Sequence, residues 1–300
     1  MPKKINCPVC GGTIYQKLEI HTLKLQLPSP YTVVYCTNCN IIRLDPQPTQ
    51  LEYVEHYSDS MYYSSQQYEQ RANMKIPIFH ARMNLIESFS EKAEGTRNIL
   101  DLGCAGGHFL KVAKDRGWTP IGIEISPVLA SYATRYVGCQ IFSSMNDVAN
   151  NLKITMDVIH SNHSLEHISN PYEIVKEAFF LLKPGGILVV EVPYEFGSWR
   201  DIIKLSLIRI LGHLVASKFF SPPVDSLHHT YFYTPTTIQL LINKAGFIIE
   251  YLSTVNPAYY QTGLFSTTKR IGYRFFDTIA SFINRGPVIV CVARKPYTCI

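Results

Sequence analysis

Apolar runs alternate with amphipathic stretches through the middle of the chain. The run at 99–102 is apolar apart from one acidic residue, and the stretch at 109–116 carries apolar residues at helical spacing between charged ones. The apolar run predicts a buried strand, and the helical spacing after it predicts a helix whose apolar face covers that strand. Strands of this kind are predicted over 99–102, 120–125, 139–142, 156–160 and 187–192.

Helical patterns separate most of these predicted strands. Ser126 and Pro127 are typical of a helix start, as N-cap and first helical residue, and Asn170 with Pro171 begins another helix. A further helix is predicted over 76–89, ahead of the first strand. Regular alternation of strands and helices indicates an α/β fold with a doubly wound, mostly parallel sheet, in which ligands bind at the carboxyl ends of the strands.

The turn after the first predicted strand is rich in glycine. The sequence from Asn98 to His108 reads N-I-L-D-L-G-C-A-G-G-H. Glycine lets the backbone approach a ligand closely, and the helix that follows points its unpaired N–H groups toward the same place. The sequence therefore predicts a ligand-binding turn that forms half of a nucleotide site.

Two acidic residues indicate which ligand fits this turn. Glu124 ends the second predicted strand, 21 positions beyond Gly103, where an acid can accept hydrogen bonds from both ribose hydroxyls of a nucleoside. A dinucleotide site carries G-x-G-x-x-G, whereas the order here is D-x-G-x-A-x-G with Asp101 upstream. A carboxylate there repels a pyrophosphate and suits the cationic amino group and sulfonium of S-adenosylmethionine. We therefore predict a methyl-donor site.

The expected contacts of this donor follow from the order of the strands. The carboxylate and the glycines of the turn are expected to hold its methionine end, and Glu124 its ribose. The third predicted strand ends at Ser143 and Ser144, which are expected near adenine. The predicted cofactor-binding residues are Asp101, Gly103, Ala105, Gly107, Glu124, Ile125, Ser143, Ser144 and His160.

Four cysteines near the N-terminus form two C-x-x-C pairs, joined by a segment long enough for a β-hairpin. Four thiolates brought together at tetrahedral corners suit zinc. A complete cysteine shell leaves no open position, so this zinc is expected to stabilise a small β zinc ribbon rather than to catalyse. A redox role is disfavoured, because a redox C-x-x-C opens a helix near a βαβ unit. The predicted zinc ligands are Cys7, Cys10, Cys36 and Cys39.

Composition narrows the class of protein further. The chain has 300 residues, of which 46% are hydrophobic and 17% charged, with a formal net charge of +5. These values are typical of a globular protein with one large and one small domain, and they disfavour a strongly cationic nucleic-acid binder. The N-terminus carries no apolar signal segment, so the cytoplasm is the expected compartment.

Four motifs in a fixed order resemble those of class I S-adenosylmethionine-dependent methyltransferases. They are D-L-G-C-A-G-G, G-I-E-I-S-P, D-V-I followed by L-E-H-I-S-N-P, and L-K-P-G-G. The resemblance runs from about residue 76 onward, with Ala105 where the family usually has a glycine. It implies the Rossmann-like methyltransferase fold, a sheet of seven strands whose last two, over 248–253 and 288–293, form a reversed hairpin.

Three parts of the chain are expected. The segment from 51 to 70, which would link the first part to the last, is rich in tyrosine. This composition favours either a lid stacking on adenine or substrate, or aromatic packing between domains. A zinc ribbon before such a domain resembles an arrangement in methyltransferases of sugars, polysaccharide precursors and secondary metabolites, and in some ribosomal RNA methyltransferases. The parts are a zinc ribbon over 1–48, linker and lid helices over 49–95, and a methyltransferase domain over 96–300 with an apolar insertion at 197–225.

The loop after the fourth predicted strand is expected to lie over the transferred methyl group. It reads S-N-H-S-L-E-H, with His163, Glu166 and His167 as candidate catalytic residues. The pKa of histidine is near neutrality, so His163 is suited to take a proton from the acceptor. Glu166 and His167 are equally compatible with merely holding the loop. His229 is the fourth candidate, because its segment H-T-Y-F-Y-T-P resembles one that returns to the active site in this family.

The segment over 201–220 is strongly apolar but is interrupted by basic residues, which makes a membrane span a poor interpretation. It is either a helix covering the substrate pocket or an interfacial helix at the inner face of the membrane, facing lipid phosphates. Its lead-in, Gly197-Ser198-Trp199, resembles the coenzyme Q biosynthetic O-methyltransferases, in which such an insertion serves membrane association. In that family the L-E-H loop carries another acid and binds a divalent metal; His163 replaces that acid here, which disfavours a catalytic metal.

We therefore predict an S-adenosylmethionine-dependent methyltransferase with a structural zinc. The predicted acceptor is a small molecule, such as a sugar, a polysaccharide or glycolipid precursor, or a secondary metabolite, methylated on oxygen, nitrogen or carbon. The first alternative is an RNA methyltransferase whose ribbon binds RNA; the few cations in residues 1–50 disfavour it, and no DNA partner is expected. The second alternative is a non-catalytic zinc adaptor with a degenerate methyltransferase fold.

Overall fold

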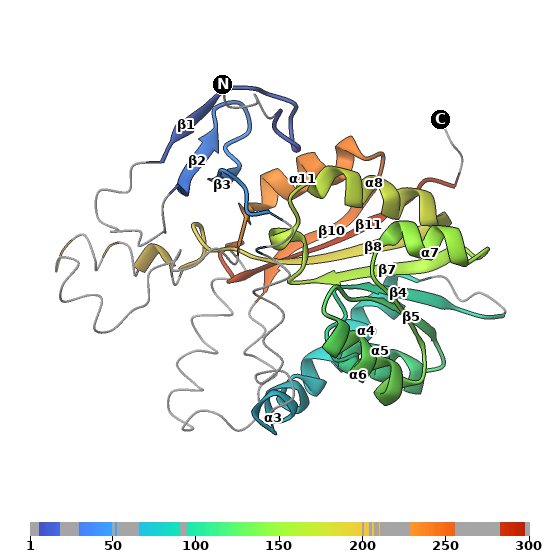
Figure 1. Ribbon diagram of the computed structural model, residues 1–300. Helices are drawn as coiled ribbons and strands as arrows, with labels where there is room; N and C mark the ends of the chain where they lie inside the picture. The colour runs from blue at the N-terminus through green and yellow to red at the C-terminus, as the bar shows by residue number, and fades with distance from the viewer. Residues whose placement is uncertain are drawn as a thin grey trace.

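The computed structural model describes residues 6–18, 30–49, 52, 66–90, 95–199, 201–203, 206, 210, 229–255 and 283–297. Its centre is a seven-stranded sheet in the order β10-β11-β8-β7-β4-β5-β6 (Figure 1). β11 runs antiparallel to β8 and β10, and the remaining neighbours are parallel. This confirms the predicted α/β fold, with β11 as the reversed strand. The strands are β4 (Asn98–Leu102), β5 (Thr119–Ile123), β6 (Gln140–Phe142), β7 (Met156–Asn162), β8 (Leu182–Pro193), β10 (Ile248–Val255) and β11 (Val288–Arg294).

Helices cover both faces of this sheet, as Figure 1 shows. Ile99 packs with side chains of α4 and α5, whereas its neighbour Leu100 packs in the other layer with side chains of α8 and α11. Because both faces are buried, apolar residues of β4 point to both sides of the sheet, and apolar and polar residues do not alternate along it. The helices are α4 (Ile76–Phe89), α5 (His108–Asp115), α6 (Pro127–Val137), α7 (Met145–Asn151), α8 (Pro171–Leu181) and α11 (Pro235–Lys244).

The pattern of the sequence does not predict α7. Its seven residues bury only Met145 and Val148, so they form no apolar stripe over several turns. Its start depends on a cap instead, because the Ser144 hydroxyl accepts a hydrogen bond from the Asp147 N–H at 3.1 Å. The helix predicted over 76–89 is confirmed at both ends.

A second, four-stranded sheet has the order β1-β2-β3-β9. Its first three strands are the hairpin of the predicted ribbon, β1 (Tyr15–Lys17), β2 (Thr32–Cys36) and β3 (Ile42–Asp45), seen as a small sheet beside α11 in Figure 1. The fourth, β9 (Tyr231–Phe232), comes from the far end of the chain and pairs antiparallel with β3. One sheet thus crosses the boundary predicted at residue 48, and the division of the chain into separate parts stays a prediction.

Two predicted features lie largely outside the described residues. They are the tyrosine-rich segment at 51–70, of which only 52 and 66–70 are described, and the apolar segment at 201–220, of which only 201–203, 206 and 210 are described. Within the described part of the chain, no helix has the length and hydropathy needed to cross a bilayer.

Candidate active site

The carboxyl ends of β4, β5, β6 and β7 meet at one edge of the sheet, because these strands are parallel. A cavity of about 950 Å³ opens there. Volumes of roughly 300–1,000 Å³ are usual for sites that bind small molecules and cofactors. Gly107, Glu166 and His229 lie outside its lining. The predicted site residues within the lining are Asp101, Gly103, Ala105, Glu124, Ile125, Ser143, Ser144, His160, His163 and His167.

The turn between β4 and α5 contains residues in the left-handed region, with φ of 77° at Gly103 and 47° at Ala105. A Cβ on Gly103 would lie 2.2 Å from Oγ and 2.9 Å from Cβ of Ser164, in the loop after β7. Glycine is therefore required at 103 both by the backbone conformation and by the close approach of that loop.

Gly107 serves helix packing. It is the N-cap of α5, with φ of 79°, and a Cβ there would lie 2.7 Å from Cγ2 of Val137 and 3.1 Å from Cβ of Ala133, both in α6. Without a side chain at 107, the start of α5 can lie against α6. The predicted contact of Gly107 with the cofactor stays a prediction.

Glu124 is buried immediately after β5 and is held by backbone donors. Its Oε2 accepts a hydrogen bond from the Ala105 N–H at 2.9 Å, and its Oε1 accepts one from the Ser126 N–H at 2.8 Å. Burial raises the pKa of Glu124, and the backbone hydrogen bonds counteract this shift only in part. Each carboxylate oxygen has a second lone pair, so ribose hydroxyls can still donate to both.

His160, in β7, lies between two carboxylates. Its Nδ1 is 2.8 Å from Oδ1 of Asp101, and its Nε2 is 3.3 Å from Oε1 of Glu191. Burial disfavours a charge on this imidazole, but the hydrogen bonds and charges of the two carboxylates outweigh it and raise the pKa of His160 to about 9. The ring of Phe109 stacks on it at 4.1 Å between centroids. His160 therefore carries a positive charge at neutral pH.

The buried group of Asp101, His160 and Glu191 is joined by Arg82 of α4, which forms an ion pair with Glu191. All four groups are nearly excluded from solvent. Burial opposes the charge of Glu191, but Arg82 and His160 hold its pKa below the usual range. The sequence argument that the charge of Asp101 selects a cationic ligand is weakened, because His160 already offsets that charge.

A further wall of the cavity, beside the glycine turn, is formed by α3 (Gln66–Met74) and the residue that follows it. The sequence indicated a lid as one alternative for the tyrosine-rich segment 51–70, but it did not predict the cations of this wall. The Gly106 N–H donates to the Tyr68 hydroxyl at 2.9 Å. Arg71 and Lys75 bring two cations to the cavity lining, and burial together with the charge of Arg71 lowers the pKa of Lys75. Their i,i+4 spacing just before a predicted helix was the available signal.

The loop after β7, which contains a 3₁₀ turn η1 (Leu165–His167), forms another side of the cavity. His163 is partly exposed there, and its Nδ1 lies 3.3 Å from Oε1 of Glu166. The Glu166 side chain is fully buried. Burial opposes its charge, but the adjacent His163 and the charges of His163, His167 and His229 hold the pKa of Glu166 below the usual range. A buried carboxylate thus lies behind an imidazole that reaches the cavity.

The segment before β9 brings His229 to the same place. Its ring lies 4.9 Å from that of His167, centroid to centroid, and its Nδ1 is 2.9 Å from Oε1 of Glu195. Burial raises the pKa of Glu195, although His229 opposes this shift. The four predicted catalytic residues therefore lie close together, with three histidines around Glu166. Only His163 and His167 line the cavity.

Three of these side chains have the donor set of a metal site. One ligand atom from each of Glu166, His167 and His229 lies within 4.8 Å of the others. Imidazole nitrogens and a carboxylate oxygen suit a divalent transition metal. The group does not include His163, so the replacement that disfavoured a metal from the sequence does not decide the matter.

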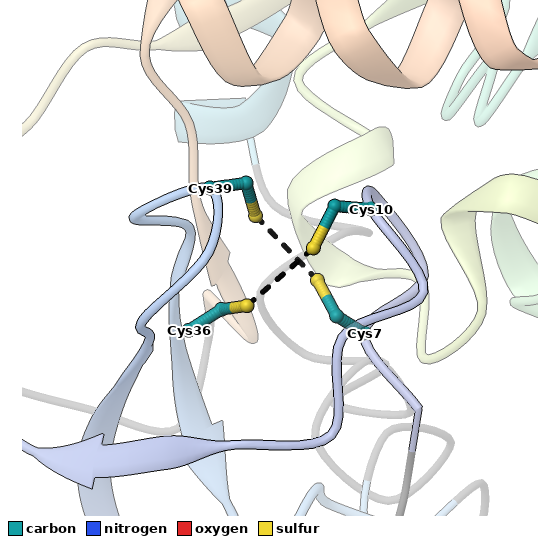
Figure 2. Close-up of side chains that lie close together, drawn as sticks. All are labelled: Cys7, Cys10, Cys36 and Cys39. Carbon is teal, nitrogen blue, oxygen red and sulfur yellow. Dashed lines mark hydrogen bonds between the residues drawn. The ribbon is translucent and has the colours of Figure 1, made fainter.

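The four predicted zinc ligands come together in the ribbon (Figure 2). Sγ of Cys7 is 3.6 Å from Sγ of Cys39, and Sγ of Cys10 is 3.6 Å from Sγ of Cys36. Tetrahedral Zn–S bonds of about 2.3 Å place sulfurs about 3.8 Å apart, so the cluster fits zinc. The hydrogen bond between Cys7 and Cys39 lowers the pKa of Cys7 and raises that of Cys39, so one of these two thiols loses its proton more readily than the other.

Comparison with known proteins gives the same class. Residues 74–252 match the family model described as "Methyltransferase domain". This match spans more than half of the chain. The chain belongs to this methyltransferase family, and its predicted class, the class I S-adenosylmethionine-dependent methyltransferases, is confirmed.

Curated relatives cover only part of the chain. A ubiquinone biosynthesis O-methyltransferase of Vibrio parahaemolyticus is 28% identical over 163 residues, 51% of this chain and 66% of its own. A 2-methyl-6-phytyl-1,4-hydroquinone methyltransferase of Synechocystis is 35% identical over 129 residues, 38% of this chain and 40% of its own. The chain thus spans less than two thirds of the length of these relatives.

One solved structure shares the fold across most of the chain. It belongs to the complex between the Haloferax volcanii Trm112 methyltransferase activator and a methyltransferase. The similarity has a TM-score of 0.54 at 14% identity and covers 80% of this chain and 98% of the other. At this identity the likeness concerns the fold alone.

Proposed function

We propose that this chain transfers a methyl group from S-adenosylmethionine to a small-molecule acceptor. The observation that carries the proposal is the single cavity between the glycine turn and the histidine loop. Glu124 and Asp101 line one side of it, and His163 lines the other. The contact between Gly103 and Ser164 brings the two sides together. Donor and acceptor would therefore share one space.

Three polar parts of the donor, the ribose, the adenine and the carboxylate, would each have a matching partner in the site. Glu124 would accept hydrogen bonds from the ribose hydroxyls, and Ser143 and Ser144 would lie near adenine, as the sequence predicts. Arg71 and Lys75, both in the cavity lining, would pair with the carboxylate of the methionine part. The cationic wall of α3 thus complements the carboxylate of the donor.

The histidine loop would supply the proton acceptor. S-adenosylmethionine, when bound, supplies an electrophilic methyl group on a sulfonium. His163 directs Nδ1 toward Glu166, so its Nε2 is the nitrogen suited to take the proton that the acceptor loses. The negative charge of Glu166 would stabilise the resulting imidazolium. The cavity walls would align the acceptor with the methyl group.

The acceptor is proposed to be a small molecule rather than RNA. Two relatives are named for ubiquinone biosynthesis and for a phytyl hydroquinone, which supports small-molecule chemistry. Within the sequence, the modest net charge of +5 argues against a phosphate-tracking surface. A sugar, a glycolipid-type precursor or a secondary metabolite remains the proposed acceptor class.

The test combines calorimetry with an activity screen. The full chain should bind S-adenosylmethionine, and it should transfer a labelled methyl group into the lipid or small-molecule fraction of a cell extract. Label confined to the RNA fraction would replace this proposal with the RNA methyltransferase. Absence of donor binding would favour the non-catalytic adaptor.

A peripheral location at the inner face of the membrane is proposed for the segment over 201–220. Its described residues Ile202, Ile203 and Ile210 are exposed, as an interfacial helix requires. In a flotation assay with anionic vesicles, the full chain should rise with the vesicles, whereas a variant that lacks 201–220 should stay in the bottom fraction. Equal partitioning of the two proteins would reject the membrane contact.

A further inference from the structure

The short strand β9 joins the acceptor site to the zinc ribbon. Tyr231 lies opposite Arg43 in the register of β9 with β3, and the Leu44 N–H donates to the carbonyl oxygen of Thr230 at 2.9 Å. His229 immediately precedes this pairing. A strand of two residues has too few hydrogen bonds to hold its own conformation. The position of His229 therefore depends on the ribbon strand beside it.

The opposite edge of β9 contacts the loop that carries the candidate base. The Thr230 N–H donates to the carbonyl oxygen of Glu166 at 2.8 Å. The Tyr231 hydroxyl donates to the carbonyl oxygen of Ser169 at 3.0 Å, and the side-chain amide of Gln47 donates to the same hydroxyl. β9 is thus held between the ribbon on one side and the histidine loop on the other.

Three of the four predicted zinc ligands, all but Cys10, lie in the hydrophobic core that supports this arrangement. Cys7, Cys36 and Ile41 belong to the same cluster of buried side chains as Tyr231 and Leu165. Metal binding in small ribbons is coupled to their folding, so order in β3 depends on the zinc. A continuous set of packed side chains therefore leads from the metal to the histidine loop.

We propose that the zinc ribbon is a positioning element of the acceptor site: zinc orders β3, β3 holds β9, and β9 places His229 beside Glu166 and His167. That this site binds the acceptor rests on the proposed function, whereas the contacts between the ribbon, β9 and the histidine loop do not depend on it. None of the described residues in 1–48 lines the cavity. We therefore expect the ribbon to act on the acceptor half of the site, which is the loop at 163–167 with His229, and to leave the donor half, which is the glycine turn with Glu124, unchanged.

Amide hydrogen exchange of the full chain, with zinc bound and after chelation, tests this coupling. Two amides serve as reporters: Thr230, which donates to Glu166, and Ala105, which donates to Glu124. Chelation should speed exchange at Thr230 by about tenfold or more while Ala105 and donor affinity change less than about twofold. Unchanged exchange at Thr230, with fast exchange at the Asn40 amide of the ribbon, would overturn the proposal.

Chelation could unfold both halves together, so a pair of variants that retain the zinc ligands is decisive. Gln47→Ala removes the side-chain link from the ribbon to Tyr231, whereas Gln16→Ala removes an exposed bond to Tyr35 within the ribbon. Only Gln47→Ala should speed exchange at Thr230 and shift the imidazole NMR signals of His229, identified by their loss in His229→Gln. Equal behaviour of the two variants would overturn the proposal.

Two further outcomes separate this proposal from the proposed function. If the wild type fails to bind S-adenosylmethionine, the proposed function is wrong, and the exchange comparison still decides the role of the ribbon. If the zinc-loaded chain binds RNA and exchange at Thr230 is indifferent to zinc, the ribbon is a nucleic-acid module and the positioning role is wrong.

Discussion

The donor half and the acceptor half of the cavity are assembled in different ways. The donor half comes mainly from one continuous stretch, 98–144, in which backbone amides of a turn orient Glu124. The proposed acceptor half is lined by the loop at 163–167, with His229 beside His167 but outside the lining, and a ribbon strand at 42–45 supports it. Local chain geometry therefore builds the donor half, whereas the acceptor half depends on contacts between distant segments.

Both halves pair a carboxylate with a histidine, yet burial separates their roles. Both ring nitrogens of the buried His160 face carboxylates, Nδ1 that of Asp101 and Nε2 that of Glu191, so neither nitrogen is open to an acceptor. His163 is 43% exposed beside the buried Glu166. The same pair of groups therefore supports structure where it is enclosed and can exchange protons where one member faces a cavity.

The largest expected effect concerns the acceptor half. His163→Gln should lower the rate of methyl transfer by about 10²–10⁴-fold, because a positioned base is lost, while donor affinity stays the same. The measurement is the initial rate with labelled donor on the active extract fraction, with calorimetry alongside. His167→Gln is the matched control, since its ring is 3.8 Å from Glu166 and should cost far less. Equal losses in both variants would remove His163 from its proposed role.

The buried histidine of the donor half predicts a pH dependence of stability. The folded pKa of His160 is about 9, above its value of 6.5 in the unfolded chain, so its charge stabilises the fold fully below pH 6.5. This stabilisation, on the order of 3 kcal/mol, is lost as pH rises through 9. Urea unfolding of the wild type should therefore show a falling free energy between pH 7 and 9.5, and His160→Asn a flatter curve. Parallel curves would show that the imidazole is neutral in the fold.

Glu124 tests the donor half directly. Glu124→Ala should weaken binding of S-adenosylmethionine by roughly 100-fold, because two hydrogen bonds to a charged group are lost. Calorimetry gives the affinity. Glu177→Ala is the control, as this carboxyl group lines the same cavity from α8. A similar loss in the control would point to the net charge of the cavity rather than to ribose recognition.

The smallest expected effect is at the point where the two halves touch. Gly103 and Gly117 both have left-handed backbones, with φ of 77° and 81°, so alanine strains both. Only at Gly103 would the new Cβ also meet Ser164, whereas at Gly117 the nearest atom is 3.6 Å away. Gly103→Ala should cost about 2 kcal/mol more than Gly117→Ala in urea unfolding. Equal costs would mean that the histidine loop moves aside freely.

Local patterns in the sequence were sufficient for the glycine turn and the acid of the proposed donor half, but not for Arg71 and Lys75. The period of the apolar residues predicted the strands and most helices around the sheet, and the glycines with Glu124 predicted the turn and its acid. The two C-x-x-C pairs predicted a cysteine cluster that the structure confirms. The apolar pattern did not predict α7, because its two buried residues form no stripe.

Contacts between distant segments were decided only by the tertiary structure. No local pattern reports that His160 meets Asp101 across neighbouring strands, or that β9 completes the sheet of the ribbon. Such pairings depend on strand order and shared core packing, which have no period along the chain. The sequence by itself therefore determined the class of protein and its glycine turn. Tertiary structure decided which charges face one another and what holds the acceptor residues.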